Sequence, residues 1–326
     1  MGFSMSDKTK ILVTGGCGFI GANLVPELLA DGYQVRVLDN LSRGFESYLD
    51  LERVELHRGD IRDQEVVDVA MDGIDLVIHL AAYGSVVESI AEPDENFDIN
   101  ARGTLNVLKG AQRAGVKRVV FSSTGGAIMG DTPPPVDELS VPKPISPYGA
   151  SKLCGEAYAY AFAGSYGLQV VVLRFGNIYG PWSAHKKGAV TVFAKALMTG
   201  ETIRIFGDGS ASRDFLHVSD LCDGIRKAMI QEGLDTLSVF HLASERETTV
   251  MELAEMMREL AGLPNHPIEY LPGRRGEVTR NFAACDKAHR VLGFTPRRDL
   301  KQGMDETWRW FLDNREEALA METSDS

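Results

Sequence analysis

The sequence predicts an α/β fold in which helices cover both faces of a doubly wound parallel sheet. Strand-like apolar runs alternate with helical patterns through the first half of the chain, and these runs are apolar throughout rather than at every second residue. Strands that are joined by crossover helices are parallel, and strands buried on both faces need continuous apolar sequence. The expected strands are 10–13, 34–38, 54–57, 76–80, 118–121 and 169–173, and the expected helices between them are 22–31, 65–71, 99–114 and 151–166.

The second half of the chain is less regular and predicts a smaller α/β domain that covers the first. A short strand is expected at 203–206, and helices are expected at 190–199, 221–231, 251–261 and 299–312. We expect residues 1–178 with about 213–245 to form the sheet domain. Residues of about 179–212 with 246–326 are expected to form the smaller, substrate-binding domain.

The composition excludes several classes of protein. The chain has 326 residues, of which 44% are hydrophobic and 25% charged, and a formal net charge of -12 at pH 7. These fractions are typical of a globular protein. The acidic balance argues against a nucleic-acid partner, because proteins that bind nucleic acid carry a basic face. No stretch approaches the roughly 20 apolar residues of a membrane span, so no membrane association is expected.

Cysteine usage indicates a reducing compartment. Cys17, Cys154, Cys222 and Cys285 are widely separated and none belongs to a CxxC pair. A disulfide framework would be denser, and a zinc site would show paired spacing, so we expect neither a disulfide nor a metal. The first ten residues lack the apolar core of a secretory signal. We therefore expect a cytoplasmic protein.

A glycine-rich turn follows the first predicted strand and opens the first helix. Its glycines have the spacing GxxGxxG. Glycine is needed because the turn is tight, a pyrophosphate comes close to the backbone, and the helix packs closely on the strand. The phosphates then lie at a helix N-terminus, where free N–H groups and the helix dipole favour negative charge. A Rossmann-type dinucleotide site is predicted at Gly15, Gly18, Phe19, Ile20 and Gly21.

The acid at the end of the second strand selects the dinucleotide. A carboxylate at Asp39 accepts hydrogen bonds from two ribose hydroxyls and repels a 2′-phosphate, so we expect NAD rather than NADP. Asp60 is placed to meet the adenine amine, and small residues after the fourth strand let the backbone approach the cofactor. The further cofactor contacts expected at these strand ends are Asn40, Asp60, Ile61, Leu80, Ala81 and Ala82.

A tyrosine–lysine pair supplies the candidate catalytic groups. Tyr148 and Lys152 are four residues apart and share one face of a helix. We expect Lys152, together with the charge of NAD⁺, to lower the pKa of Tyr148, because a nearby cation favours the phenolate. A phenolate near pH 7 is a competent base for a sugar hydroxyl. Ser122, Ser123 and Thr124 end the preceding strand, which places one hydroxyl beside the Tyr148 oxygen.

With these features the chain resembles the extended short-chain dehydrogenases/reductases, in the branch of NAD-dependent nucleotide-sugar epimerases and dehydratases. The resemblance covers nearly the whole chain. It is carried by the motifs GGCGFIG at 15–21, HLAA at 79–82, SSTGG at 122–126, SPYGASK at 146–152, RFGNIYGP at 174–181, SRDFLHVSDL at 212–221 and RRGEV at 274–278.

The resemblance implies a role for each candidate residue. Tyr148 takes the proton of the 4-hydroxyl while hydride moves from sugar C4 to NAD⁺, Lys152 holds the nicotinamide ribose, and Thr124 bonds the 4-oxygen. Asn100 and Ser122 are implied to support the cofactor end of the site. The residues implied to bind the UDP-sugar are Ser123, Thr124, Asn177, Arg213, Arg274, Glu277 and Asn281. Two arginines suit a pyrophosphate, because a guanidinium fork neutralises its oxygens.

The residues after Thr124 separate reactions that share oxidation at C4. Family dehydratases carry Asp-Glu at these places and decarboxylating relatives carry a glutamate, whereas this chain has Gly125 and Gly126, which transfer no protons. The resemblance therefore implies a 4-epimerase of the UDP-glucose/UDP-galactose type. UDP-glucuronate 4-epimerase and UDP-N-acetylglucosamine 4-epimerase remain as alternatives. A dehydratase or decarboxylase, and a non-catalytic NAD-binding sensor of the same fold, are further ones.

One loop and two single residues are relevant to the choice of sugar and to cofactor binding. The basic loop His185-Lys186-Lys187 is either a solvated lid or a contact for substrate phosphates or a C6 carboxylate. Asn281 stands where family members restricted to plain hexoses tend to have a bulky tyrosine, and its amide suits an acetamido group. Gly84 stands where the family's 4-epimerases can carry lysine. The resemblance also implies a homodimer that forms through the helices near 99–114 and 151–166.

Overall fold

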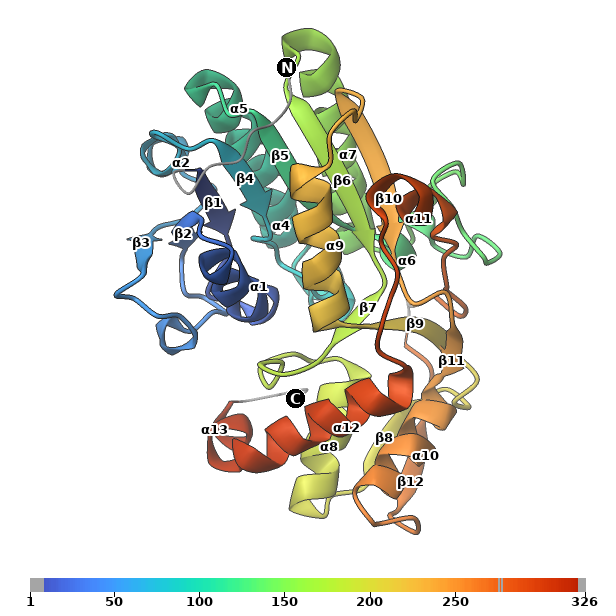
Figure 1. Ribbon diagram of the computed structural model, residues 1–326. Helices are drawn as coiled ribbons and strands as arrows, with labels where there is room; N and C mark the ends of the chain where they lie inside the picture. Colours follow the sequence, from blue (N-terminus) through green and yellow to red (C-terminus); the bar gives the residue numbers. More distant parts are fainter. Residues whose placement is uncertain (1–8, 275, 277, 322–326) are drawn as a thin grey trace.

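A parallel sheet of seven strands forms the centre of the larger part of the molecule (Figure 1). The computed structural model describes residues 9–274, 276 and 278–321. The strand order is β10-β6-β5-β4-β1-β2-β3, and neighbouring strands are parallel. The strands are β1 (Lys10–Thr14), β2 (Gln34–Asp39), β3 (Val54–Arg58), β4 (Leu76–His79), β5 (Arg118–Thr124), β6 (Gln169–Phe175) and β10 (Leu237–Leu242). The predicted doubly wound sheet is confirmed.

The order of the strands marks where a ligand binds. The chain runs outward from β1 through β2 to β3 and then crosses to β4 on the other side of β1. In such a sheet the ligand crevice lies outside the carboxyl ends of the strands, where the order reverses. The ends of β1 and β4 therefore border the expected site.

Helices cover both faces of the sheet and form two cores. Alternate strand side chains point to opposite faces, so that Ile11 and Val13 enter one core and Leu12 enters the other. The first core is covered by α1 (Phe19–Ala30), α9 (Val218–Ile230) and α11 (Asp286–Leu292). The second is covered by α2 (Gln64–Ala70), α5 (Gly103–Ala114) and α7 (Pro147–Tyr166).

A third core belongs to the smaller part of the molecule, which lies below the large sheet in Figure 1. Its helices are α8 (Ala189–Thr199), α10 (Val250–Leu260), α12 (Leu300–Asp313) and α13 (Arg315–Ala320), packed on the parallel pair β8 (Ile203–Phe206) and β12 (Ile268–Leu271). A three-stranded sheet adjoins it, formed by β7 (Asn177–Tyr179), β9 (Ser212–His217) and β11 (Glu247–Thr249). We keep the expected two-domain division as a proposal with one change. Residues 283–294, which include α11, pack in the first core with the large sheet.

Several short elements carry no periodic signal and are absent from the expected set. They are η1 (Glu46–Tyr48), α3 (Val86–Ala91), α4 (Pro93–Phe97) and α6 (Gly125–Met129), whereas the expected helix 99–114 consists of the π-helical turn η2 (Asp98–Arg102) followed by α5. The helix α7 begins four residues before the expected start, because the Ser146 hydroxyl accepts from Gly149 N–H and Pro147 fits the first turn. Tyr148 therefore lies in the first turn of α7.

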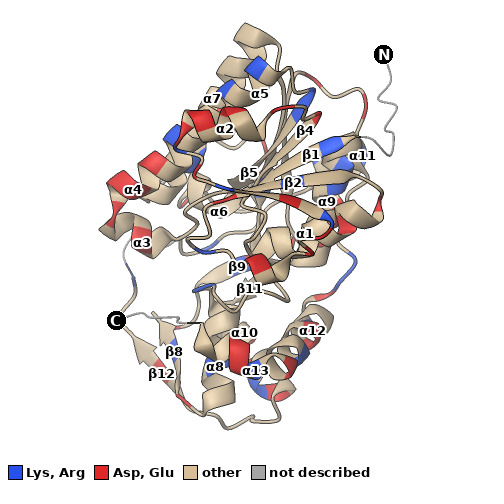
Figure 2. Cartoon of the chain, turned by 90° about the vertical axis from the view of Figure 1, so that its left-hand side faces the viewer, with Lys and Arg blue, Asp and Glu red and all other residues tan. Residues whose placement is uncertain are grey.

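Charged side chains lie mainly on the outer helices. Figure 2 shows acidic residues on α3, α4 and α10, whereas most residues of the central strands are uncharged. Within the described part of the chain, every helix is too short or too polar to span a lipid bilayer.

Candidate active site

The glycine-rich turn between β1 and α1 forms a cradle into which no side chain fits. Gly15 has a φ of +71°, and a Cβ at this position would lie 2.6 Å from the backbone nitrogen of Ala81. A Cβ on Gly21 would overlap the carbonyl oxygen of Gly16. Only glycine combines this backbone conformation with these close approaches. Free N–H groups at the start of a helix favour an anion, so the cradle fits a pyrophosphate. The start of α1 comprises the predicted residues Gly18, Phe19, Ile20 and Gly21.

Asp39 is fixed against this cradle. It ends β2, and its buried carboxylate accepts from the N–H of Cys17 (Oδ2–N 3.0 Å) and from the N–H of Leu41 (Oδ1–N 2.8 Å). Burial raises the pKa of Asp39, and the two N–H bonds oppose that shift. A carboxylate has about four acceptor positions. Two of them therefore remain for the ribose hydroxyls that the sequence predicts as ligands.

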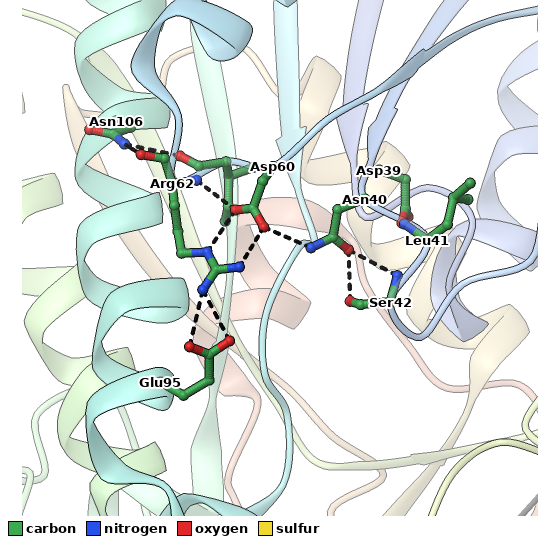
Figure 3. Close-up of polar contacts among 9 residues, drawn as sticks. Asp39, Asn40, Leu41, Ser42, Asp60, Arg62, Glu95 and Asn106 are labelled. Carbon is green, nitrogen blue, oxygen red and sulfur yellow. Dashed lines mark hydrogen bonds and ion pairs between the residues drawn. The ribbon is translucent and has the colours of Figure 1, made fainter.

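Asp60, by contrast, has its acceptor positions filled (Figure 3). Its Oδ1 accepts from N (2.8 Å) and Nε (3.0 Å) of Arg62, and its Oδ2 accepts from Arg62 Nη2 (2.8 Å) and Asn40 Nδ2 (2.9 Å). Burial opposes ionisation of Asp60, but these bonds outweigh it and hold the pKa at about 2. Arg62 also bonds both carboxylate oxygens of Glu95 at 3.0 Å. In this arrangement Asp60 has no acceptor left for the adenine amine, and the predicted contact requires that Arg62 or Asn40 move.

The loop after β4 closes the other side of the cradle. Leu80 N–H donates to the Thr14 carbonyl (3.0 Å), and Ala81 N–H donates to the Thr14 hydroxyl (3.3 Å). Ala82 follows and is half-buried like its two predecessors. Ile61 is buried, and its carbonyl accepts from Asn106 Nδ2 (3.0 Å). The structure thus brings the predicted loop residues next to the glycine turn.

Thr124, Tyr148 and Lys152 come together beside the end of β5. Thr124 is the last residue of β5, its hydroxyl accepts from the N–H of Ala127 (3.4 Å), and its side chain is near enough to Tyr148 to lower the pKa of the phenol. The N–H of Tyr148 donates to the hydroxyl of Ser89 (3.1 Å), which fixes the first turn of α7. Lys152 is buried one turn later, and its ammonium donates to the carbonyl oxygen of Ser122 (Nζ–O 2.8 Å). The three predicted catalytic groups therefore form one cluster.

The electrostatics of this cluster differ from the prediction. Burial raises the pKa of Tyr148 to about 12, although the side chain of Thr124 lowers it. Burial lowers the pKa of Lys152 to about 7, and the charge of Glu156 opposes that shift. The prediction that Lys152 lowers the pKa of Tyr148 is wrong for the protein's own groups. Lys152 bonds a carbonyl instead of the phenol, and burial penalises the charged form of both residues.

The two serines before Thr124 have structural partners. The Ser122 hydroxyl donates to the His79 carbonyl (2.8 Å). The buried Ser123 hydroxyl donates to Oε1 of Glu156 (2.5 Å). The substrate contact of Ser123 stays a prediction, and in the structure its hydroxyl hydrogen is used inside the protein. The contribution of Ser122 to the site is its carbonyl, which holds Lys152.

A buried ion pair lies beneath the catalytic cluster. Glu156 follows Lys152 by one helical turn and accepts from Arg174 Nη2 (2.8 Å) and Nε (3.1 Å). This pair was not predicted, but two features of the sequence indicate it. Glu156 stands one helical turn after Lys152, and Arg174 directly follows the apolar strand 169–173. Buried charges are retained when they are paired, so both positions point to one network.

Asn100 ties the loop after β4 to the catalytic helix. It lies in the π-helical turn η2, and its Oδ1 accepts from Tyr83 N–H (2.7 Å). Its Nδ2 donates to the Ser151 hydroxyl (3.0 Å), which also donates to the carbonyl of Tyr148 (2.9 Å). π-Helical turns occur frequently at functional sites. These bonds give Asn100 the supporting role that the resemblance implies.

The predicted substrate residues come from four segments. Asn177 is exposed at the start of β7, and β7 pairs with β9, which carries the half-buried Arg213. The guanidinium of Arg274 stacks 3.6 Å from the ring centre of Phe206 at the end of β8. Glu277 lies outside the described residues. Asn177 and Arg213 therefore lie on paired strands, and Arg274 lies against the end of β8.

Asn281 reaches the catalytic loop itself. It is only 4% exposed, and its N–H donates to the carbonyl of Ser212 (3.2 Å), next to Arg213. A Cβ on Gly126 would lie 3.1 Å from the side-chain oxygen of Asn281. Asn281 therefore packs against Gly126 in the first turn of α6, and Gly126 follows Thr124 by two residues.

The sequence pattern of the NAD dependent epimerase/dehydratase family matches residues 11–239. The chain belongs to this family. NAD is the cofactor of its members, which agrees with the glycine cradle and with the placement of Asp39. The family predicted from the motifs is confirmed, and with it an enzyme of the epimerase/dehydratase type.

Individual relatives cover nearly the whole chain and differ in reaction. The solved UDP-glucose 4-epimerase of Thermotoga maritima with UDP-glucose is 37% identical, with a TM-score of 0.90, and covers 94% of this chain and 100% of its own. The UDP-glucose 4-epimerase of Mycolicibacterium smegmatis is 35% identical and covers 93% of this chain and 98% of its own. A dTDP-glucose 4,6-dehydratase of Streptomyces niveus is also 35% identical, over 94% of both chains. Similarity alone therefore leaves the reaction open.

Proposed function

We propose that this protein is a nucleotide-sugar 4-epimerase that interconverts UDP-glucose and UDP-galactose with bound NAD. The observation that carries the proposal is the cluster of Thr124 at the end of β5, Tyr148 in the first turn of α7 and buried Lys152, whose ammonium donates to the Ser122 carbonyl, at the same sheet edge as the glycine cradle. The relatives named UDP-glucose 4-epimerase support this choice. A non-catalytic sensor has no need of this cluster.

Each residue of the cluster has one task in the proposed reaction. Tyr148 as phenolate takes the proton of the sugar 4-hydroxyl and later returns it. Thr124 holds the phenol oxygen beside the 4-oxygen, and Lys152 is held in place by the Ser122 carbonyl. When bound, NAD accepts the C4 hydride and returns it, and its oxidised ring brings positive charge that favours ionisation of the buried phenol. Between removal and return of the hydride, the 4-keto sugar rotates in the site and presents its other face to the cofactor.

The residues around the α6 turn favour epimerisation over dehydration. Dehydration needs an acid–base pair for C5 and C6, and the two positions after Thr124 are glycines. A Cβ on Gly125 would lie 3.1 Å from the His241 ring, and a Cβ on Gly126 would lie 3.1 Å from Asn281. His241 and Asn281 thus crowd the Cβ positions from which a proton-transferring side chain at 125 or 126 would extend. This supports an epimerase rather than a dehydratase like the Streptomyces niveus relative.

One observation favours a second sugar, UDP-N-acetylglucosamine. Asn281 is buried, yet its Nδ2 has no hydrogen-bond partner among the described residues. A buried donor ordinarily has a partner, so a ligand oxygen suits this position. The carbonyl of an acetamido group is such an acceptor. UDP-glucuronate stays an alternative; of the basic loop, Lys187 is paired with Glu88 (2.9 Å).

The test is incubation of the purified enzyme with UDP-glucose, UDP-N-acetylglucosamine and UDP-glucuronate, with the products separated by chromatography. We expect UDP-galactose from UDP-glucose. Asn281→Tyr should lower activity on the acetamido sugar about 10-fold to 100-fold, since overpacking costs about 1–3 kcal/mol, and should spare UDP-glucose. Asn281→Ser is the matched control that keeps the pocket open. Equal losses on both sugars would remove Asn281 from the specificity proposal, and a dehydrated product would overturn the reaction.

We also propose a homodimer that works in the cytoplasm. Tyr158 and Tyr160 are exposed large side chains of α7, one of the helices that the resemblance assigns to the dimer contact. Such exposed apolar groups mark interaction surfaces when they gather on one face. The four cysteines are free, which fits a reducing compartment. Sedimentation equilibrium tests the dimer: a monomer at micromolar concentration would contradict it.

A further inference from the structure

The loop between β7 and α8 reaches the cofactor side of the site. This loop, residues 180–188, runs between the two parts of the molecule (Figure 1). The ring of His185 lies 5.8 Å from that of Phe45, and Trp182 lies 4.7 Å from Tyr48. The N–H of Phe45 donates to the carbonyl of Cys17 in the glycine turn (2.9 Å). The loop therefore packs on a segment that is itself bonded to the phosphate cradle.

Lys186 points from this loop toward Gly84. A Cβ on Gly84 would have a single atom within 4 Å, the Nζ of Lys186, at 4.0 Å. Lys186 is half-buried, and within the described chain its ammonium has no hydrogen-bond or ion-pair partner. Gly84 lies two residues after Ala82, in the loop that closes the cradle. The ammonium is thus held at the rim of the cradle without a counter-charge of its own.

Lys186 lies near other cationic groups. Glu88 pairs with both Arg43 (2.9 Å) and Lys187 (2.9 Å). The guanidinium of Arg43 lies 4.3 Å from the ring centre of Tyr83, next to Gly84. Burial lowers the pKa of Lys186, Arg43 adds to that shift, and Glu88 opposes it. In the part of the chain that the structure describes, Glu88 thus pairs with Arg43 and Lys187 but not with Lys186.

We propose that Lys186 binds the pyrophosphate group of the dinucleotide from the loop of residues 180–188. Two features place the anion there: the glycine cradle, whose rim is the loop of Ala81 and Gly84, and the unpaired ammonium aimed at that rim. A pyrophosphate oxygen at this position would give the Lys186 ammonium a charge-assisted partner. The lysine thereby links cofactor retention to a loop of the substrate side. The inference rests on the proposed use of bound NAD.

The first test measures how fast NAD leaves the purified protein. Lys186→Gln should release NAD about 10-fold to 100-fold faster than wild type, since a hydrogen bond to a charged group contributes about 1.5–3 kcal/mol. Lys117→Gln is the matched control: it makes the same change of charge, but Lys117 is paired with Asp75 (2.8 Å) just before β5, at the far edge of the sheet. This control should retain NAD like wild type. Equal release by Lys186→Gln and wild type would overturn the inference.

The second test moves the ammonium to the neighbouring loop. Gly84 is exposed, and its Cβ position is open apart from Lys186, so a lysine fits there. Gly84→Lys combined with Lys186→Gln should restore slow release of NAD. A merely structural role of Lys186 in its own loop would not be rescued from position 84. Failure of the rescue, with the fold intact by circular dichroism, would therefore contradict the proposed contact.

The third test separates the two pyrophosphates that the site could hold. UDP binding to the NAD-loaded Lys186→Gln variant should match wild type within about 3-fold, because a change of well under 1 kcal/mol is expected where no contact is lost. Weakened UDP binding with unchanged NAD release would assign Lys186 to the nucleotide sugar and overturn the inference. Wild type that holds no NAD would overturn the proposed function instead, so the two failures are distinguishable.

Discussion

Two arginine–carboxylate networks flank the candidate site and differ in burial. Under the catalytic cluster, Arg174 and Glu156 are 6% and 2% exposed in their side chains. At the cofactor end, Arg62 bonds Asp60 and Glu95, with side chains that are 36%, 25% and 46% exposed (Figure 3). Both arginines make charge-assisted bonds of similar length. The chemistry is the same, and only the access of water distinguishes the two networks.

Burial gives the two networks different consequences. A buried charge without its partner carries a large desolvation penalty, so Arg174 and Glu156 hold each other and the Ser123 end of β5 in one arrangement. An exposed pair contributes little, because water replaces its partner and salt screens it. The catalytic end is therefore fixed before any ligand binds, whereas the cofactor end can rearrange when adenine arrives.

The largest expected difference between the networks is in stability. Glu156→Ala should lower the free energy of unfolding by about 3–5 kcal/mol, because it leaves Arg174 buried and unpaired. Glu95→Ala should lower it by less than about 1 kcal/mol. Urea unfolding of both variants measures the contrast. Similar losses in the two variants would show that burial does not determine how much each ion pair contributes to the free energy of unfolding.

A smaller difference is expected in the pH dependence of turnover. The pKa of Lys152 is about 7, and the charge of Glu156 favours the ammonium form. Glu156→Gln removes that charge, so the pKa of Lys152 falls further and the ammonium is lost at lower pH. We expect the alkaline limb of the pH–rate profile to move to lower pH. Glu95→Gln is the control, and a profile that moves equally in both variants would contradict the link from Glu156 to Lys152.

The smallest expected effect concerns the acid stability of the cofactor end. The pKa of Asp60 is about 2, below its ordinary value of 3.8, so the bonds from Arg62 stabilise the fold above about pH 4. That contribution is lost as the pH falls through 2. Arg62→Met should therefore cost less than about 1 kcal/mol at pH 6 and almost nothing near pH 2. A difference that persists at pH 2 in urea unfolding would assign Arg62 another role.

The sequence predicts most of the fold and of the cofactor end, because the signals there are local. The glycine turn and Asp39 follow consecutive strands, and their order alone brings them to one sheet edge. Tyr148 and Lys152 are likewise joined by one helical turn. The state of Asp60 is not predictable in this way, since it depends on the side-chain conformation of Arg62.

Contacts between distant segments account for the rest. Ser123 and Glu156 are 33 residues apart, so no local pattern in the sequence shows the bond that the hydroxyl makes in the structure. Lys186 meets Gly84, about a hundred residues earlier, through the packing of His185 on Phe45. No periodicity or spacing encodes such pairs. They follow from how the two parts of the molecule pack.

The most direct test of the account compares wild type with Tyr148→Phe on UDP-glucose. Wild type should form UDP-galactose with no net consumption of NAD. Tyr148→Phe should retain bound NAD and lose about 100-fold to 10,000-fold in turnover, which is the usual contribution of general acid–base catalysis. Turnover close to wild type in Tyr148→Phe would contradict the central claim that this tyrosine is the base of a 4-epimerase.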